Sequence, residues 1–303
     1  MAQDLPGDGL PALPVVFSHP QAVLAGVRPD RPRGRDITRL TRGVYTLRQP
    51  VDYQLRVRAA CLALGDDSVV HGVTALRLWG VDLPQRLLDD EVIHVLRRQR
   101  TFPTTRHDVC AHRDRLQFRP CTLDGLAITH PAEAWLQVAS HLSMEDLTHV
   151  ADALMRRQRP LITQDTLARA VRRSHRRPGI RTARTALDLA RASTDSWPET
   201  SVRLLLVRAG LPCPEVNLPV RDEAGRVVFY LDMAYEAQRT GVEYDGAYHV
   251  GDRAAMESDR ARRRWLEDRG WRLIPATAAD LRDGRALVAS VRQALAARSV
   301  AQS

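Results

Sequence analysis

Apolar residues in the last third of the chain switch between helical and strand spacing. From Ser196, an N-cap residue, they recur at helical spacing to about Ala209, and Gly210 ends this helix. The elements expected next are strands at 215–220 and 227–235 joined by a turn at 222–225, a strand at 241–244, a charged helix at 252–269, a strand at 271–274 and a helix at 278–298. This order predicts an α/β sandwich around a mixed sheet in a domain at 196–303.

The middle of the chain mixes both spacings without this regularity. A strand is expected at 92–96, and helices are expected at 132–142, 144–158 and 181–191. Ser143 is the expected N-cap of the second helix. We therefore predict an α+β region with a polar linker at 85–195, and its pattern indicates no chemistry.

The first segment predicts a small DNA-binding architecture. The expected elements are a short helix at 20–26, an arginine-dense linker and helix at 28–42, a strand at 43–47 and an amphipathic helix at 53–64. Helix, basic helix and β-wing are the parts of a winged helix-turn-helix. We place this domain at 15–84, after a Pro- and Gly-rich segment at 1–14 that we expect to be disordered.

Composition adds a strong positive charge. The 303 residues carry a net charge of +9, and each of the 45 basic residues is an arginine. Guanidinium groups bind phosphate bidentately, so the charge favours a nucleic-acid partner, and no lysine is present to serve in catalysis. The candidates for phosphate contacts in the first domain are Arg31, Arg33, Arg35, Arg39 and Arg42. The alternative is that these arginines form a solvated basic face.

No signal for export or membrane insertion is visible in the sequence. No apolar run approaches the roughly 20 residues of a membrane span, and the acidic first residues lack the basic start of a signal peptide. We therefore expect a cytoplasmic protein without a membrane partner. The four cysteines form no CxxC pair, which argues against a zinc site and a disulfide framework. Buried free thiols are expected at Cys61, Cys110, Cys121 and Cys213.

Acidic side chains on two predicted strands are the candidate chemistry. Strand alternation places Leu231 and Met233 on one face and Asp232 on the other. Glu243 and Asp245 share one face of the next strand, about 7 Å apart. If the strands form a hairpin, the three carboxylates converge, and a divalent cation relieves their repulsion. Mg²⁺ or Mn²⁺ there would orient a phosphate and activate water. The alternative is a solvated sheet face whose acids pair with arginines.

Four more residues accompany this acidic set. Glu199 is expected to form a capping box and, if its helix begins beside the sheet, to join the carboxylates. His249 is either an ordinary loop histidine or a general acid or base. Asp259 and Arg262 lie on the sheet-facing side of the charged helix. Arg262 could hold a phosphate with Asp259 orienting it, or the two could form an exposed ion pair.

These residues resemble a known family. The similarity rests on the segments Ser196-Trp-Pro-Glu199, Leu231-Asp232-Met-Ala, Val242-Glu-Tyr-Asp-Gly-Ala-Tyr-His249, Asp259-Arg-Ala-Arg262 and Gly270-Trp271-Arg-Leu. They look like the very-short-patch-repair-like endonuclease domains of actinobacterial proteins of unknown function, a branch of the PD-(D/E)XK nuclease superfamily. The resemblance covers about 196–281 and implies a restriction-endonuclease-like fold and Mg²⁺-dependent cleavage of DNA. It implies Asp232 as the central metal ligand, Glu199 as the helix acid, Glu243 as the second strand acid, and His249 near the scissile phosphate.

Two features depart from that family. The superfamily lysine two residues after the strand acid is Asp245 here, which can supply a metal ligand but not a cation. The cysteines of the short-patch enzyme's structural zinc site and its mismatch-wedging aromatics have no counterpart in the sequence. Mismatch specificity therefore does not carry over.

The first two segments resemble a second family. The similarity rests on Phe17-Ser-His-Pro-Gln-Ala, Arg42-Gly-Val-Tyr, Val70-His-Gly-Val-Thr-Ala-Leu-Arg-Leu-Trp-Gly80 and Leu126-Ala-Ile-Thr-His-Pro-Ala-Glu-Ala-Trp135. They look like proteins with an abortive-infection antitoxin domain of the type IV toxin–antitoxin class, which implies a winged-helix DNA-binding N-terminus, an antitoxin-like module and a candidate partner toxin. His71 and Trp79 are either core or functional residues. Two hypotheses follow: a DNA-binding, Mg²⁺-dependent endonuclease, or a non-catalytic DNA-binding regulator or antitoxin with a degenerate nuclease domain.

Overall fold

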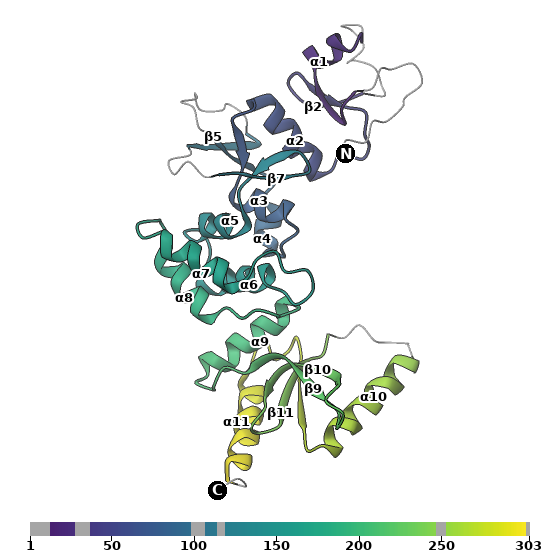
Figure 1. The fold of residues 1–303 in the computed structure, drawn as a ribbon, viewed down its shortest axis with the longest axis vertical. Helices are drawn as coiled ribbons and strands as arrows, with labels where there is room; N and C mark the ends of the chain where they lie inside the picture. The colour runs from purple at the N-terminus through teal and green to yellow at the C-terminus, as the bar shows by residue number, and fades with distance from the viewer. Residues whose placement is uncertain (1–12, 28–36, 98–106, 114–118, 247–252, 301–303) are drawn as a thin grey trace. The chain divides into compact units, whose positions relative to one another are not determined.

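The computed structural model describes residues 13–27, 37–97, 107–113, 119–246 and 253–300 (Figure 1). The chain forms two compact units, Met1–Val138 and Ala139–Ser303. Both units contain helices and β-sheet, so the predicted α/β class is confirmed. The division into units differs from the expected one, because the segment predicted at 85–195 is shared between them.

The first unit begins with a small antiparallel sheet in the order β1-β3-β2. Its strands are β1 (Val16–Ser18), β2 (Thr38–Thr41) and β3 (Val44–Thr46), accompanied by helices α1 (His19–Leu24) and α2 (Tyr53–Leu64). Phe17 stacks on Tyr45 within a buried core that includes Leu13 and Ile37. The strand and helix predicted at 43–47 and 53–64 are confirmed.

The prediction of a linker and helix over 28–42 is wrong for residues 37–42, the part of this segment that the structure describes. Residues Thr38–Thr41 form strand β2 and pair with β3. The β-branched residues Thr38 and Thr41 favour extended backbone, and Gly43, with φ of 76°, allows the tight turn into β3. The arginines at the end of this segment therefore lie on a hairpin.

A five-stranded sheet in the order β6-β5-β4-β8-β7 forms the rest of the first unit. Its strands are β4 (Ser68–Val70), β5 (Ile93–Arg97), β6 (Val109–Arg113), β7 (Cys121–Leu123) and β8 (Leu126–Ile128), and its helices are α3 (Gly72–Leu78), α4 (Gln85–Asp89) and α5 (Pro131–Val138). Helix α3 packs against α5 and β5. Because β4 pairs with β5 and β8, the boundary expected at 84/85 separates strands of one sheet.

Three helices open the second unit: α6 (Met144–Leu154), α7 (Gln164–Arg173) and α8 (Ile180–Leu189). Ser143 caps α6 as predicted, and its hydroxyl oxygen accepts the N–H of Asp146. Gly179 begins α8 with φ of 78° and lies against the backbone of Ala139, where a Cβ atom would be 2.4 Å from the Ala139 carbonyl carbon. Only glycine fits this approach.

A buried polar network joins α6 to the next helix, α9 (Trp197–Arg208). The Asp152 carboxylate accepts hydrogen bonds from the Arg203 guanidinium at 2.6 Å, the Thr200 hydroxyl at 2.8 Å and the Arg191 amide at 2.8 Å. The His149 ring stacks on Trp197 with centroids 3.9 Å apart. These contacts cross the boundary expected at 195/196, so no separable linker lies there.

A mixed sheet in the order β12-β11-β10-β9 forms the body of the second unit. Its strands are β9 (Glu215–Arg221), β10 (Val227–Tyr235), β11 (Thr240–Tyr244) and β12 (Arg272–Ala276). Strands β9, β10 and β11 are antiparallel neighbours, and β12 runs parallel to β11. The mixed character of the sheet agrees with the prediction from the sequence.

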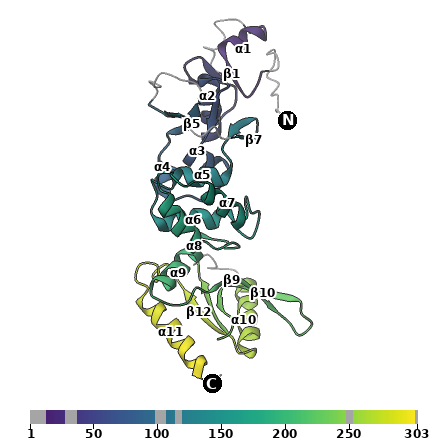
Figure 2. The ribbon, with the colours of Figure 1, turned by 60° about the vertical axis from the view of Figure 1, so that its left-hand side comes forward.

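Helices cover both faces of this sheet. Residues of α9 and α11 (Arg285–Val300), including Val202 and Val291, form one core with Val242. Leu266 of α10 (Arg253–Asp268) forms a second core with Leu231. Figures 1 and 2 show α11 and α10 on opposite sides of the sheet. The unit is therefore a sandwich with the sheet in the middle layer.

Strict alternation along β10 is interrupted at Asp232. Leu231 belongs to the core beneath α10, whereas Met233 belongs to the core beneath α9 and α11. The prediction that these two residues share a face is wrong. The neighbouring strand β9 carries Asn217 with φ of 50°, and the Asp232 carboxylate rather than a carbonyl accepts the Tyr244 amide. The change of face therefore falls at Asp232, while the register with β9 is the same on both sides of it.

The four cysteines all lie within the described residues. All four cysteines are free, but Cys213, which lies between two prolines before β9, is exposed and the other three are half-buried, so the expectation of buried thiols was wrong. No helix in the described ranges has both the length and the apolar character to cross a membrane.

Candidate functional site

Asp232 lies opposite Glu243 at the end of the β10–β11 pairing. The register pairs Met233 with Val242, so the next position outward sets Asp232 against Glu243. Asp232 Oδ2 accepts the backbone N–H of Tyr244 at 3.0 Å. This bond holds the carboxylate at the point where the two strands stop pairing.

Glu199 brings a third carboxylate from the start of α9. The Ser196 oxygen accepts the Glu199 N–H, and the Glu199 carboxylate accepts the Ser196 hydroxyl at 2.7 Å and the Asp195 amide at 3.0 Å. The predicted N-cap at Ser196 is confirmed. The Glu199 side chain completes the cap by accepting the backbone N–H of Asp195. The side chain is buried, and this burial raises the pKa of Glu199.

The charged form of Asp232 is less favourable than that of an ordinary aspartate. Burial and then the negative charge of Glu199 raise the pKa of Asp232 to about 6, and Glu243 adds to the rise, while the hydrogen bond from Tyr244 opposes it. The charges of Glu199 and Glu243 therefore both act on Asp232, where the central strands β10 and β11 stop pairing. A divalent cation would relieve this repulsion.

Glu243 is neutralised by an arginine from α10. The Arg262 guanidinium forms a two-pronged ion pair with Glu243, with Nη1 at 2.9 Å from Oε2 and Nη2 bonded to Oε1. Nη2 also donates to the carbonyl of Tyr230 at 3.0 Å. The bond to Glu243, with Asp232 and Asp259 contributing less, raises the pKa of Arg262. The sequence left pairing with arginines as the alternative role for the acids on this sheet face. Glu243 does pair with an arginine.

The other predicted site residues are placed differently. Asp245 is exposed just beyond β11, where its backbone N–H donates to Ala276. In the part of the chain that the structure describes, Asp245 does not join Asp232 and Glu243 in a set whose ligand atoms all lie within 4.8 Å of one another. Asp259 is exposed on α10. His249 lies outside the described residues.

The arginines predicted to contact phosphate in the first unit are only partly described. Arg31, Arg33 and Arg35 lie outside the described residues. Arg39 is exposed on β2, and Arg42 is exposed in the turn between β2 and β3. Both side chains therefore belong to a β-hairpin, the element expected to act as a wing.

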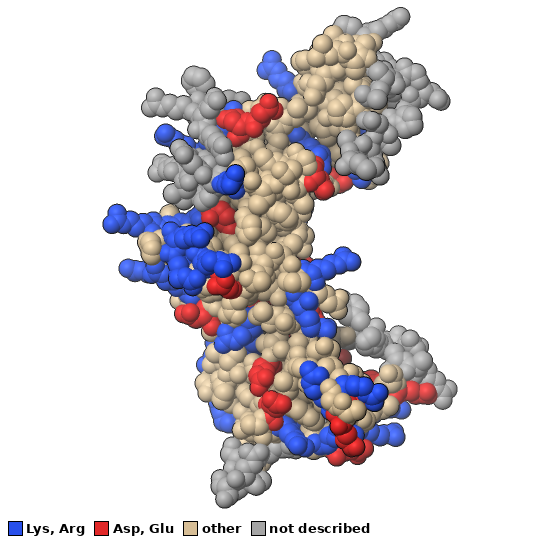
Figure 3. Space-filling view, viewed as in Figure 1, with Lys and Arg blue, Asp and Glu red and all other residues tan. Residues whose placement is uncertain are grey.

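Helices α7 and α8 carry an arginine patch that the sequence analysis missed. The exposed members are Arg169, Arg172, Arg173, Arg176, Arg181 and Arg184. Asp165 forms an ion pair with Arg169 and lies 3.8 Å from Arg172. Figure 3 shows blue side chains gathered over these two helices. The signal was present in the run Arg-Arg-Ser-His-Arg-Arg at 172–177, which covers the end of α7 and the segment that follows it. Such a block of like charges is typical of an interaction surface for a polyanion.

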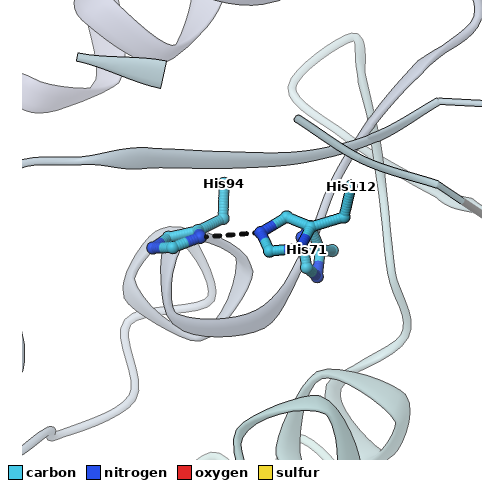
Figure 4. Close-up of side chains that lie close together, drawn as sticks. All are labelled: His71, His94 and His112. Atoms are coloured by element: carbon cyan, nitrogen blue, oxygen red, sulfur yellow. Dashed lines mark hydrogen bonds between the residues drawn. The ribbon is translucent and has the colours of Figure 1, made fainter. Parts of the chain in front are cut away.

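A cluster of three histidines in the first unit was also missed. His71, His94 and His112 each offer one ring nitrogen within 4.8 Å of the other two (Figure 4). His71 was considered only as a core or functional residue beside Trp79. The indole N–H of Trp79 donates to the carbonyl of Thr129 at 3.0 Å, which gives that side chain a structural role.

Comparison with known proteins extends over most of the chain. No family model matches it. It is 29% identical over 248 residues to two proteins of Mycobacterium tuberculosis strains, both described as uncharacterized, MT2308 and Rv2248. The match spans 81% of this chain and 87% of each relative. Since neither compact unit is 248 residues long, the similarity reaches into both. Neither description states an activity.

Proposed function

We propose that the protein is a DNA-binding, Mg²⁺-dependent endonuclease that hydrolyses phosphodiester bonds in its second unit. One observation carries the proposal. Asp232 sits beside Glu199 and Glu243 with its pKa raised to about 6, an arrangement that costs stability unless a ligand uses it. The sandwich around a mixed sheet is compatible with the restriction-endonuclease-like fold implied by the sequence resemblance.

The donor set fits Mg²⁺. This ion prefers hard oxygen ligands and needs only one or two carboxylates, because it keeps several waters and takes further ligands from substrate phosphates. Asp232 and Glu243 would hold it, and Glu199 would act on Asp232 through its charge. When bound, the ion would polarise a phosphoryl oxygen and lower the pKa of a coordinated water.

Arg262 gives the site a second element. Its planar fork now binds the Glu243 carboxylate, and the same fork fits a phosphate. A cation that takes over Glu243 would release Arg262 toward the DNA backbone. Arg262 would then bind a phosphate, while Asp232 and Glu243 would hold the cation. The Tyr244 amide would keep the Asp232 carboxylate in position.

Two basic surfaces would bind the duplex. The hairpin with Arg39 and Arg42 would act as the wing of an N-terminal winged-helix module, as the antitoxin-like resemblance implies. The arginine patch on α7 and α8 would add phosphate contacts in the second unit. Phosphate contacts supply affinity without reading sequence, so we propose no sequence preference.

A non-catalytic DNA-binding regulator or antitoxin is the second candidate. The Arg262–Glu243 ion pair favours it, because an acid already compensated by an arginine has less need of a metal. Asp245, where the superfamily carries lysine, favours it as well. In this case the second unit binds DNA without cutting it, and a partner toxin becomes the candidate protein partner.

Plasmid cleavage distinguishes the two candidates. We expect the full chain to nick or linearise plasmid in Mg²⁺ or Mn²⁺ and to be inactive in a chelator. Asp232→Ala and Glu243→Ala should lose cleavage, while Glu236→Ala, an exposed acid on the β10–β11 turn, should retain it. Retained DNA binding without cleavage in the wild type would establish the regulator instead.

The DNA-binding surfaces are tested by salt dependence. The slope of log Kobs against log salt is about 0.9 per phosphate contact on duplex DNA. The double change Arg173→Ala/Arg176→Ala should therefore lower the slope by up to ~2. The control Arg282→Ala/Arg285→Ala, on exposed arginines at the start of α11, should leave it unchanged. Equal slopes for both pairs would remove the α7–α8 patch from the interface.

A further inference from the structure

The five-stranded sheet of the first unit brings three histidines together on one face. His71 follows β4 directly, and its amide donates to the carbonyl of His94 on β5 at 3.2 Å, which continues the β4–β5 pairing by one position. On the other side of β5, the parallel register pairs His94 with Cys110 and Leu96 with His112. Since side chains repeat every two residues, His112 points to the same face as Cys110 and therefore as His94.

The rings are arranged with nitrogen atoms toward one another. His94 Nδ1 lies 3.2 Å from His112 Nε2. The His71 ring stands edge-on to the His112 ring, with centroids 4.5 Å apart and an interplanar angle of 81°. One nitrogen from each ring lies within 4.8 Å of the other two. Figure 4 shows the three side chains converging on one place.

These distances match what a tetrahedral ion requires. A Zn–N bond of about 2.0–2.1 Å at tetrahedral angles sets neighbouring ligand nitrogens ~3.3 Å apart. The His94–His112 pair already has this spacing. The two distances from the His71 nitrogen to the other ring nitrogens need only small rotations of the imidazole rings to reach this value, because all three nitrogens lie within 4.8 Å of one another. Imidazole nitrogens favour zinc and its neighbours over magnesium, which prefers oxygen.

We propose that His71, His94 and His112 form a Zn²⁺ site in the first unit. His71 is buried, His94 is half-buried and His112 is exposed, so the site is anchored in the sheet and opens to solvent on the β6 side. Three protein ligands leave the fourth position of a tetrahedral ion to water or to a small anion. This is the arrangement of zinc sites that act on a ligand, whereas purely structural sites use four protein ligands.

The site is independent of the proposed nuclease chemistry. It uses nitrogen rather than oxygen ligands, and its residues lie in the first compact unit, whereas Asp232 and Glu243 lie in the second. The absence of CxxC pairs argued against zinc at the level of sequence. Histidines 23 and 18 positions apart become neighbours only through strand pairing, so they form no short sequence motif.

Metal binding by the intact chain tests the proposal. The protein is stripped with a chelator, dialysed against ZnCl₂ in excess Mg²⁺, and its metal content and affinity are measured. We expect one Zn²⁺ per chain in the wild type. His94→Ala and His112→Ala should bind it at least ~10-fold more weakly, since even the loss of a group that only orients a ligand costs this much. Substitution by Co²⁺ should give the intense visible absorption of a four-coordinate ion in the wild type but not in His94→Ala or His112→Ala.

Two controls separate this site from other metal binding. His107→Ala removes an exposed histidine just before β6 and should bind Zn²⁺ like the wild type. Asp232→Asn should also bind normally, which excludes the acidic site as the source. Because His112 is exposed, its replacement leaves the fold intact, and circular dichroism of each variant checks this. The proposal is overturned if His112→Ala binds zinc as tightly as the wild type, or if the wild type holds no zinc.

Discussion

Replacing Asp152 should destabilise the second unit more than any change at its surface. The Asp152 and Arg203 side chains are 2% and 1% exposed, and their ion pair at 2.6 Å is completed by bonds from Thr200 and the Arg191 amide. Asp152→Ala removes the carboxylate and leaves the guanidinium buried without its counter-charge. Breaking one side of a buried pair costs about 3–5 kcal/mol. We expect a loss of this size in the free energy of unfolding.

Urea unfolding followed by circular dichroism measures this loss. The exposed pair of Asp165 and Arg169 on α7 provides the control, because Asp165→Ala should cost well under about 1 kcal/mol. A double variant, Asp152→Leu/Arg203→Met, should recover much of the stability, since apolar side chains replace the pair without leaving a lone charge. The reasoning is refuted if Asp152→Ala costs no more than Asp165→Ala, or if the double variant loses the sum of the single losses.

Three further predictions concern single side chains. Because the pKa of Asp232 is raised to about 6, its charge destabilises the metal-free fold above that pH, and this effect fades as the pH falls toward 4. Asp232→Asn should therefore raise the free energy of unfolding at pH 7.5 by at most ~3 kcal/mol. Thermal unfolding should show no gain for this variant at pH 4. Burial lowers the pKa of His149 to about 4, so the folded protein binds fewer protons than the unfolded chain and loses stability as pH falls from about 6.5 to 4. In His149→Phe the urea midpoint of unfolding should depend less on pH across this interval. An unchanged pH dependence would contradict the lowered pKa of His149. Arg262→Ala frees Glu243, so Mg²⁺ should raise the melting temperature of this variant more than that of the wild type, whereas an equal or smaller rise would show that the ion pair does not compete with the metal.

Local signals were sufficient for most elements of the second unit. The β-branched and aromatic run at 227–235 matches β10 residue for residue, and Ser196 with Gly210 marked both ends of α9. The closing helix was placed too early. It begins at Arg285 because the Asp280 carboxylate first binds the amide and hydroxyl of Thr277 and holds a turn there. Such a side-chain turn competes with helix in a way that hydrophobic spacing does not register.

Contacts between distant segments account for what the sequence did not predict. Arg262 forms its ion pair with Glu243, 19 positions away in the sequence. The spacing of residues on one helix predicts a pair of Arg262 with Asp259 equally well. The same limit applies to Asp152 and Arg203, which lie 51 positions apart and whose pairing joins α6 to α9. The histidine cluster depends on the register of three strands, and a shift by one residue would turn His94 to the other face. The arginine-rich run at 172–177, in contrast, is a local feature that is visible in the sequence itself.

The bond between the Tyr244 amide and the Asp232 carboxylate links a backbone hydrogen to an acid that titrates near pH 6. The nuclear magnetic resonance signal of this one amide should therefore shift with the protonation of Asp232 and with any cation that displaces the proton. Its protection from exchange with solvent deuterium, taken relative to the intrinsic exchange rate at each pH, should fall once the carboxylate is neutralised, because a weaker acceptor protects the hydrogen less. One backbone resonance thus offers a direct view of the occupancy of the acidic site, without a substrate.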